Sequence, residues 1–409
     1  MAYVIIGNGV AGVSAAESIR QIDRKVRIVM IGDETETPYC RPMISMVLEG
    51  SVAADRLPMR ADNFYEQMGI EPVLGRRVDA IDTEQKTVSI GGDTKTPYSK
   101  LLIASGADPR PIKAAGMHLK HIFFMRTQAH IREMLEIVPD ARCALVLGGG
   151  LVGFKAAYGL LRRGMNVTML IRSGYPQSMQ ADENAGKIVL QELRRKGLDV
   201  RVGIEAVAFE GNGVVREAHL SDGSRMACDM VVIGKGVLPA LSFVPRDSIE
   251  IDLGIVVDRH MRTTASDVYA AGDVAEGVDI ARKTRWVNAI WPEAVTQGRL
   301  AGMNMAGRRV SGKGSLGRNV MRIFDLDILT GGMVTPPEND GYDVFQAFDG
   351  RRNTYRKLVF REDRLAGVVL VNDIEQGGVL LAVMSSETPV TVSKEGLLSP
   401  KFNYKQLFN

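Results

Sequence analysis

Two glycine-rich segments of the same design constrain this chain more than any other feature. They start 141 residues apart, at Gly7 and Gly148, and each follows a short apolar run, 3–6 and 144–147. Small residues come after each segment, as at the start of a closely packed helix. The glycines are Gly7, Gly9 and Gly12 in the first segment and Gly148, Gly150 and Gly153 in the second. A strand, a G-x-G-x-x-G turn and a helix N-terminus form a cradle for phosphate, because the turn lets backbone approach the anion and the helix offers amide donors.

The first segment carries a second mark of a dinucleotide site. An apolar run at 26–31 ends in Gly32 and Asp33, and Asp33 lies 21 residues past Gly12. At that distance a carboxylate is expected to bind the ribose 2′-hydroxyl of a dinucleotide. Two such cradles in one chain predict two dinucleotides, and the usual pair is FAD with NADH or NADPH.

The second segment lacks this acid. Its second apolar run, 167–171, continues into Arg172 and Ser173. A guanidinium without a carboxylate suits a 2′-phosphate and so favours NADPH. A solvated Arg172 beside an unselective NADH site explains the sequence equally well, and both alternatives stay open.

Composition and charge indicate which binding partners and which cellular compartment to expect. Apolar residues make up 45% and charged residues 24% of the 409 residues, which predicts a globular protein of two to three domains. With 51 basic and 48 acidic residues, the chain has no charge excess for binding nucleic acid. No apolar run approaches a membrane span, and the first strand begins at once without a leader, so we expect a cytoplasmic protein.

The cysteines limit the redox chemistry. Cys40, Cys143 and Cys228 are too few and too scattered for a disulfide framework or a zinc site, so we expect no metal centre. No two of them are close enough in the sequence to form a C-x-x-C pair, which excludes a dithiol relay through neighbouring cysteines.

Four further segments resemble the FAD-dependent pyridine nucleotide–disulfide oxidoreductase superfamily. They are 98–107, 229–239, 263–273 and 291–299, which follow one another in the order of that family. The resemblance implies an α/β fold with two Rossmann-like domains, one for FAD and one for NAD(P), and a small C-terminal α+β domain. The implied domains are 1–112 and 238–310 for FAD, 113–237 for NAD(P), and 311–409 for dimerisation or acceptor docking.

The same resemblance implies contacts with the cofactors. The implied FAD contacts outside the glycine motif and Asp33 are Arg41, Val78, Ser105, Gly106, Arg126, Gly272, Asp273, Glu293 and Ala294. Asp273 is expected to accept a hydrogen bond from the ribityl chain. Pro292 suits a first helical turn, so the free amides of Glu293 and Ala294 are expected to face negative charge on the reduced flavin. On the nicotinamide side Lys155 stands where the family commonly has glutamate, and it is expected to pair with phosphate or to adjust the nicotinamide.

The branch of the family depends on the segment 38–45. Its Pro-Tyr-x-Arg-Pro pattern resembles rubredoxin and ferredoxin reductases and the flavin domains of nitrite reductases, although Met46 replaces a lysine found in many ferredoxin reductases. This favours an FAD enzyme that passes electrons from NAD(P)H to rubredoxin, ferredoxin or an iron–sulfur subunit. A second hypothesis makes Cys40 catalytic, as in coenzyme A disulfide or polysulfide reductases and NADH oxidases or peroxidases. A third is a nicotinamide-sensing or scaffolding subunit with little turnover.

The last third of the chain has weaker patterns. A basic, glycine-rich stretch at 308–314 is typical of a linker. Beyond it we predict strands at 355–360 and 365–371 and a helix at 374–384. These features resemble the small C-terminal sheet domain of the family, which implies a dimer face or an acceptor dock, and a homodimer is consistent with it.

Overall fold

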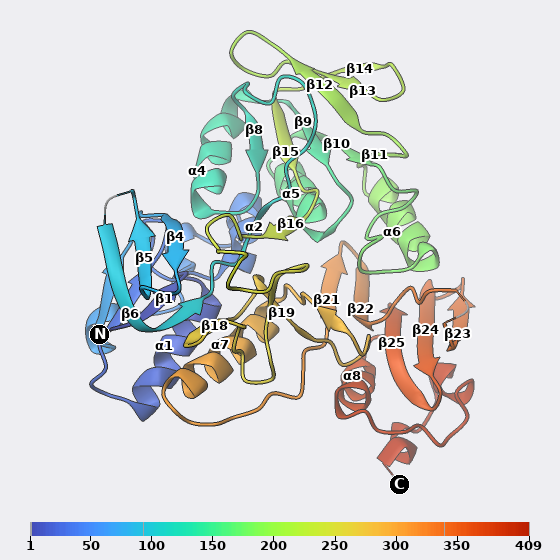
Figure 1. Ribbon diagram of the computed structural model, residues 1–409. Helices are drawn as coiled ribbons and strands as arrows, with labels where there is room; N and C mark the ends of the chain where they lie inside the picture. Colours follow the sequence, from blue (N-terminus) through green and yellow to red (C-terminus); the bar gives the residue numbers. More distant parts are fainter. Residues whose placement is uncertain (1, 93, 339, 409) are drawn as a thin grey trace. The chain divides into compact units, whose positions relative to one another are not determined.

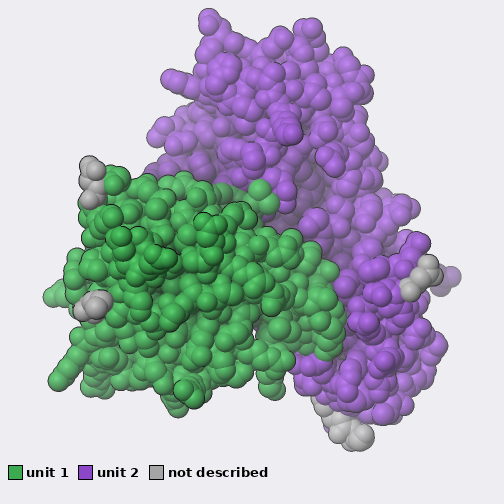
Figure 2. Space-filling view, viewed as in Figure 1, with its two compact units in different colours: residues 1–40, 57–108, 238–317 green, residues 41–56, 109–237, 318–409 purple. Residues whose placement is uncertain are grey.

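The structure is a computed structural model that describes residues 2–92, 94–338 and 340–408. By its internal contacts the chain divides into two compact units (Figure 2). Unit 1 holds residues 1–40, 57–108 and 238–317, and unit 2 holds residues 41–56, 109–237 and 318–409. The four-part domain plan implied by the sequence remains a proposal, and segment 41–56 is the clearest difference between that plan and the units.

Unit 1 is built on a parallel sheet that continues into an antiparallel extension. The parallel strands run in the order β3-β2-β1-β6-β18, and β5 and β4 extend the sheet antiparallel from β6. The first strand in the chain lies in the middle of the sheet, as the strand–turn–helix pattern requires. The sheet strands are β1 (Ala2–Ile6), β2 (Ile28–Ile31), β3 (Ile70–Val73), β4 (Val78–Asp82), β5 (Thr87–Ile90), β6 (Thr94–Ile103) and β18 (Val268–Ala270).

The two long helices of unit 1 cross at very short range. Helix α7 (Trp291–Met305) has Gly298 and Gly302 where it meets α1 (Val10–Ile22). A Cβ on Gly298 would lie 2.2 Å from the carbonyl oxygen of Ala11, and one on Gly302 would lie 2.3 Å from that of Ala15. Backbone therefore packs on backbone, which fixes α7 against α1. The other elements are α3 (Phe64–Gln67), β17 (Ile255–Val256), β19 (Ala275–Val278) and β20 (Arg285–Trp286).

The glycine-rich stretch expected as a linker has no regular secondary structure, but it is packed within unit 1. The carbonyl oxygen of Val310 lies 2.8 Å from Nδ1 of His260 and also accepts a hydrogen bond from Asn304 at 2.8 Å. The chain leaves unit 1 after Gly317. Two short strands, β7 (Ala107–Pro109) and β16 (Val237–Pro239), occur where the chain passes between the units.

Unit 2 contains a second parallel sheet, ordered β11-β10-β9-β15-β8, again with the strand before the glycine motif in the middle. An antiparallel sheet β12-β13-β14 belongs to the same unit. The elements are β8 (Ile122–Phe124), α4 (Gln128–Ile137), β9 (Cys143–Leu147), α5 (Leu151–Arg162), β10 (Asn166–Ile171), α6 (Glu183–Arg195), β11 (Asp199–Val202), β12 (Ala206–Glu210), β13 (Glu217–Leu220), β14 (Arg225–Ala227) and β15 (Met230–Ile233).

Segment 41–56 joins unit 2 because α2 (Ile44–Glu49) packs on α5. A Cβ on Gly159 of α5 would lie 3.0 Å from Cγ of Leu48. The guanidinium of Arg163 donates hydrogen bonds to the carbonyl oxygens of Leu48 at 2.8 Å and Val47 at 3.1 Å, and so caps the end of α2. Short 3-10 turns at Arg41–Met43 and Ala54–Arg56 flank this helix.

The C-terminal part of unit 2 is an antiparallel sheet ordered β21-β22-β25-β24-β23 with α8 against β25, drawn orange to red in Figure 1. It attaches to α6 through a buried ion pair in which Nζ of Lys357 lies 3.0 Å from Oδ2 of Asp182, the N-cap of α6. The strands expected at 355–360 and 365–371 are β24 and β25. The elements are β21 (Arg318–Ile323), β22 (Leu326–Gly332), β23 (Tyr342–Asp349), β24 (Thr354–Arg361), β25 (Arg364–Val371) and α8 (Gly377–Ser386), and shorter turns are at Val138–Asp140, Gly396–Leu398 and Tyr404–Phe408.

The predicted α/β fold with a C-terminal sheet is thus confirmed. Within the described residues, no helix combines the length and the apolar composition needed to span a bilayer.

Candidate dinucleotide-binding sites

The first cradle lies between β1 and α1, and its three glycines have different physical roles. Gly7 has a φ of +118°, and a Cβ there would lie 2.0 Å from the carbonyl oxygen of Ala104. A Cβ on Gly12 would lie 2.1 Å from the carbonyl oxygen of Gly7. Among the described residues beyond its chain neighbours and its own helix, none places a heavy atom within 4 Å of the Cβ position of Gly9. Two glycines therefore permit close packing, while the middle one faces open space where a pyrophosphate can approach.

The second cradle, between β9 and α5, repeats this arrangement glycine by glycine. Gly148 has a φ of +113°, and its Cβ position is 2.5 Å from the carbonyl oxygen of Gly234. The Cβ position of Gly153 is 2.0 Å from the carbonyl oxygen of Gly148, whereas that of Gly150 meets no atom within 4 Å from the described residues outside its own turn and helix. Gly234 thus lies against the glycine turn at Gly148, and our sequence interpretation gave Gly234 no role.

Both cradles fit a dinucleotide by a structural criterion. The N-cap residues of α1 and α5 are Gly9 and Gly150, and neither makes a side-chain capping hydrogen bond. A serine or aspartate at such a position would use the first-turn amides itself. With glycine there, the positive end of the helix dipole is left to an anionic ligand.

The turn at Gly272 and Asp273 forms a further wall of the first cradle. Gly272 has a φ of +84°, and its Cβ position lies 3.1 Å from Cβ of Ala11 and 3.7 Å from Cβ of Ala294. It therefore sits between the first turns of α1 and α7. Its amide donates a 2.8 Å hydrogen bond to Oε1 of Gln297, a buried residue of α7.

Gln297 is thus a supporting residue that the sequence interpretation missed. The only signal was its place within the family-like segment 291–299, one turn after the predicted contacts. Direct binding of the ribityl chain by Asp273, which is half-buried, stays a prediction.

The start of α7 corrects one expectation. Ile290 is the N-cap and Pro292 occupies the first turn, as predicted. The amide of Ala294, however, donates to the carbonyl oxygen of Ile290 at 3.1 Å, the first hydrogen bond inside the helix. That amide is therefore not free for a flavin, because it lies one residue beyond the open amides of a helix N-terminus. The contact proposed for Glu293, which is buried, is not affected.

Four other predicted FAD residues, all in unit 1, lie at the ends of strands of its sheet. Ser105 and Gly106 follow β6 next to Gly7, and Oγ of Ser105 donates to the carbonyl oxygen of Ala240 at 3.0 Å. Asp33 is exposed just after β2, and Val78 is buried at the start of β4.

Arg41 and Arg126 belong to unit 2, in contrast to the other predicted FAD residues. Nη1 of Arg41 donates to the carbonyl oxygen of Arg126 at 2.7 Å. The structure thus brings these two predicted residues together, and their contact with FAD stays a prediction.

On the nicotinamide side, Lys155 lies half-buried on the second turn of α5, and Arg172 is exposed directly after β10. The loop that follows Arg172 returns to the glycine turn, where the amide of Gln177 donates to the carbonyl oxygen of Gly149 at 2.8 Å. The predicted 2′-phosphate contact of Arg172 therefore lies in a loop that is tied to the cradle.

The three cysteines form no disulfide bond. Burial raises the pKa of the Cys228 thiol to about 12, so this thiol stays protonated and unreactive at neutral pH. Cys40 is half-buried, and its amide donates to the carbonyl oxygen of Leu57 at 2.8 Å.

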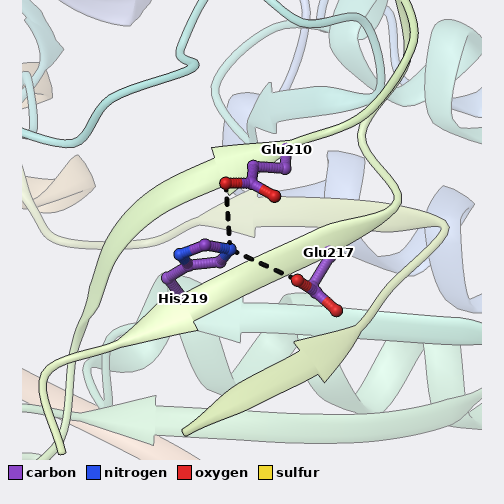
Figure 3. Close-up of side chains that lie close together, drawn as sticks. All are labelled: Glu210, Glu217 and His219. Carbon is purple, nitrogen blue, oxygen red and sulfur yellow. Dashed lines mark ion pairs between the residues drawn. The ribbon is translucent and has the colours of Figure 1, made fainter. Parts of the chain in front are cut away.

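Within the part of the chain that the structure describes, one cluster with metal-ligand chemistry lies on β12 and β13 (Figure 3). Nε2 of His219 lies 3.2 Å from an oxygen of Glu210 and 3.2 Å from Oε1 of Glu217, although neither contact has hydrogen-bond geometry. Nη1 of Arg225 lies 3.3 Å from the same Glu217 oxygen. The guanidinium charge opposes a metal cation at this oxygen, so we interpret the contacts among these side chains as ion pairs.

Comparison with known proteins decides the family. The family model for pyridine nucleotide-disulphide oxidoreductases matches residues 1–298. A second family model, for the rubredoxin NAD+ reductase C-terminal domain, matches residues 318–388. The chain belongs to the pyridine nucleotide-disulphide oxidoreductase family. FAD and NAD(P)H are the cofactors of this family, and both cradles described above suit them.

Two curated relatives and one solved structure indicate the breadth of the family. An assimilatory nitrate reductase electron transfer subunit from Bacillus subtilis is 27% identical over 97% of this chain and 51% of the relative. A rubredoxin-NAD(+) reductase from Pseudomonas putida is 28% identical over 75% of this chain and 80% of the relative. The crystal structure of the covalent putidaredoxin reductase–putidaredoxin complex matches the fold with a TM-score of 0.90 at 23% identity, covering 99% of this chain and 97% of that chain. The chain spans about half the length of the nitrate reductase subunit and of a nitrite reductase [NAD(P)H] from the same organism.

Proposed function

We propose that this protein is an FAD-dependent oxidoreductase that passes electrons from NADH or NADPH to a separate redox partner. The observation that carries the proposal is the pair of open cradles, at Gly9 and Gly150, within one chain of this family. Two dinucleotide sites of the same build are what an enzyme needs to hold a flavin and a nicotinamide at once.

FAD would supply the ability to take hydride from the nicotinamide and to release electrons to an acceptor. The chain itself binds and orients. Gly9 and Gly150 admit a pyrophosphate to the first turns of α1 and α5, whose amides face the anion. Gln297 holds the Gly272 turn in place, and the close crossing of α1 and α7 makes that wall rigid.

We infer that the acceptor is a small redox protein such as rubredoxin or ferredoxin, or an iron–sulfur subunit. The support is the match of residues 318–388 to a rubredoxin NAD+ reductase C-terminal domain, together with the relatives named above. A homodimer is consistent with such a domain. We place the protein in the cytoplasm, where cysteines that form no disulfide would stay reduced.

The acceptor is tested together with Cys40, the residue of the rival hypothesis. In a Cys40→Ser variant we expect NAD(P)H-dependent reduction of rubredoxin or ferredoxin to stay within about twofold of the parent protein, because dithiol chemistry is not needed for electron transfer from flavin. The measurement is steady-state turnover of both proteins with rubredoxin, ferredoxin, coenzyme A disulfide and peroxide as acceptors.

One pattern of results would favour the rival hypothesis. Turnover of the parent protein with disulfide or peroxide alone, lost in Cys40→Ser, would make Cys40 the redox-active residue. Cys228→Ser serves as the matched control, since that thiol is buried and protonated.

A further inference from the structure

Gln177 in unit 2 has a buried side-chain amide without a hydrogen-bond partner. Its side chain is 2% exposed, and neither its amide oxygen nor its amide nitrogen has a hydrogen-bond partner. Among the described residues it is the only side chain with both polar atoms buried and unpaired. A buried polar atom without a partner destabilises the folded state, so such a side chain calls for a reason.

The position of Gln177 suggests the reason. Its main-chain amide donates at 2.8 Å to the carbonyl oxygen of Gly149, which lies between Gly148 and Gly150 in the glycine turn. Gln177 is therefore fixed to the cradle that is expected to hold the nicotinamide nucleotide. Gln180, three residues further along the same loop, also has a buried and unpaired amide oxygen, Oε1.

The loop that carries Gln177 is held firmly. The carbonyl oxygen of Gln177 accepts hydrogen bonds from the amides of Gln180 and Ala181, both at 2.8 Å. The loop ends at Asp182, which caps α6 and accepts a 2.6 Å hydrogen bond from the hydroxyl of Tyr355 as well as the ion pair with Lys357. The main chain of Gln177 is thus held in place, and its side-chain amide starts from a fixed point beside the glycine turn.

The backbone of Gln177 is also in an unfavourable conformation. Its φ is +59°, in the left-handed region, which is unfavourable for a residue with a side chain. Backbone of this kind persists where the surrounding structure enforces it, and it concentrates at ligand-binding sites. The left-handed backbone and the unpaired amide coincide in one residue beside the glycine turn.

We propose that the side-chain amide of Gln177 is a further binding group for the nicotinamide nucleotide and hydrogen-bonds its ADP-ribose half. This rests on the proposed function of the second cradle. A carboxamide can donate to a phosphate oxygen and can both donate to and accept from a ribose hydroxyl. The glutamine side chain turns about its own torsions to reach the ligand, while its main chain stays fixed to Gly149.

The test compares Gln177→Leu with the parent protein, both with FAD bound. Leucine removes the amide and keeps similar bulk. We expect affinity for NAD+ or NADP+, whichever the parent binds, to fall roughly five- to tenfold, as for the loss of one hydrogen bond. Affinity for ADP-ribose should fall by the same factor. The melting temperature of the nucleotide-free protein should stay equal or rise, because an unpaired buried group has been removed. Calorimetric titration and thermal melting give the two readouts.

Controls separate the possible failures. Gln191→Leu, an exposed position on α6, should change neither readout. Gln177→Met replaces the leucine variant if that one does not fold. If the parent protein binds neither NAD+, NADP+ nor ADP-ribose, the proposed function itself fails. If the parent binds and Gln177→Leu binds equally well, whatever its melting temperature, Gln177 is structural and our inference alone is wrong. Loss of NAD+ affinity with unchanged ADP-ribose affinity would also contradict it, since the contact would lie on the nicotinamide half.

Discussion

A Gly9→Val variant is expected to be purified without flavin colour and without any NAD(P)H-dependent activity. The Cβ position of Gly9 faces open space at the start of α1, so the valine methyls would fill the volume that a pyrophosphate needs. The backbone of Gly9, at φ −85° and ψ −176°, is extended and suits valine. The cost to the helix cap is about 1 kcal/mol, which leaves the fold intact. Absorbance in the visible range and the FAD content of the purified protein measure the effect.

The matched control adds the same side chain where no ligand is expected. Gly378, exposed on α8, also has no heavy atom within 4 Å of its Cβ position, and Gly378→Val should retain full flavin content. Circular dichroism establishes that Gly9→Val is folded. A folded Gly9→Val protein with the flavin content of the parent would show that FAD does not bind at this turn.

The same change in the second cradle should separate the two ligands. A Gly150→Val variant is expected to keep its FAD and to lose nicotinamide binding, with a dissociation constant raised on the order of a hundredfold. The estimate corresponds to one or two lost charge-assisted hydrogen bonds of about 1.5–3 kcal/mol each. Equilibrium titration of the FAD-bound protein with NAD+ and NADP+ measures it.

Gly153→Ala distinguishes blocked binding from damaged packing. Its new methyl would lie 2.0 Å from the carbonyl oxygen of Gly148, and backbone cannot easily yield there. This variant should lose about 1–3 kcal/mol of unfolding free energy, as overpacked sites do, whereas Gly150→Val should lose much less. Equal destabilisation by the two substitutions would contradict the different roles given to the two glycines.

The sequence was sufficient for the parts of the molecule that depend on local geometry. Both cradles, their central strands and the first turn of α7 follow from glycine spacing, apolar runs and the position of Pro292. In each case one short segment contains the whole signal, because a tight turn and a helix start are set by neighbouring residues.

Features that depend on contacts between distant segments were not predictable. The packing of α2 on α5 through Gly159 and Arg163 joins residues more than a hundred positions apart, and no periodicity reports it. The support of Gly272 by Gln297 is of the same kind. The Ala294 amide was misassigned because the true N-cap, Ile290, has no capping side chain and leaves no mark in the sequence.

Anaerobic titration of the purified flavoprotein with NADH and with NADPH tests the central claim most directly. We predict that at least one of the two donors bleaches the bound flavin stoichiometrically, and that a preference for NADPH would assign the 2′-phosphate to Arg172. A flavin that stays oxidised in excess of both donors would contradict the account.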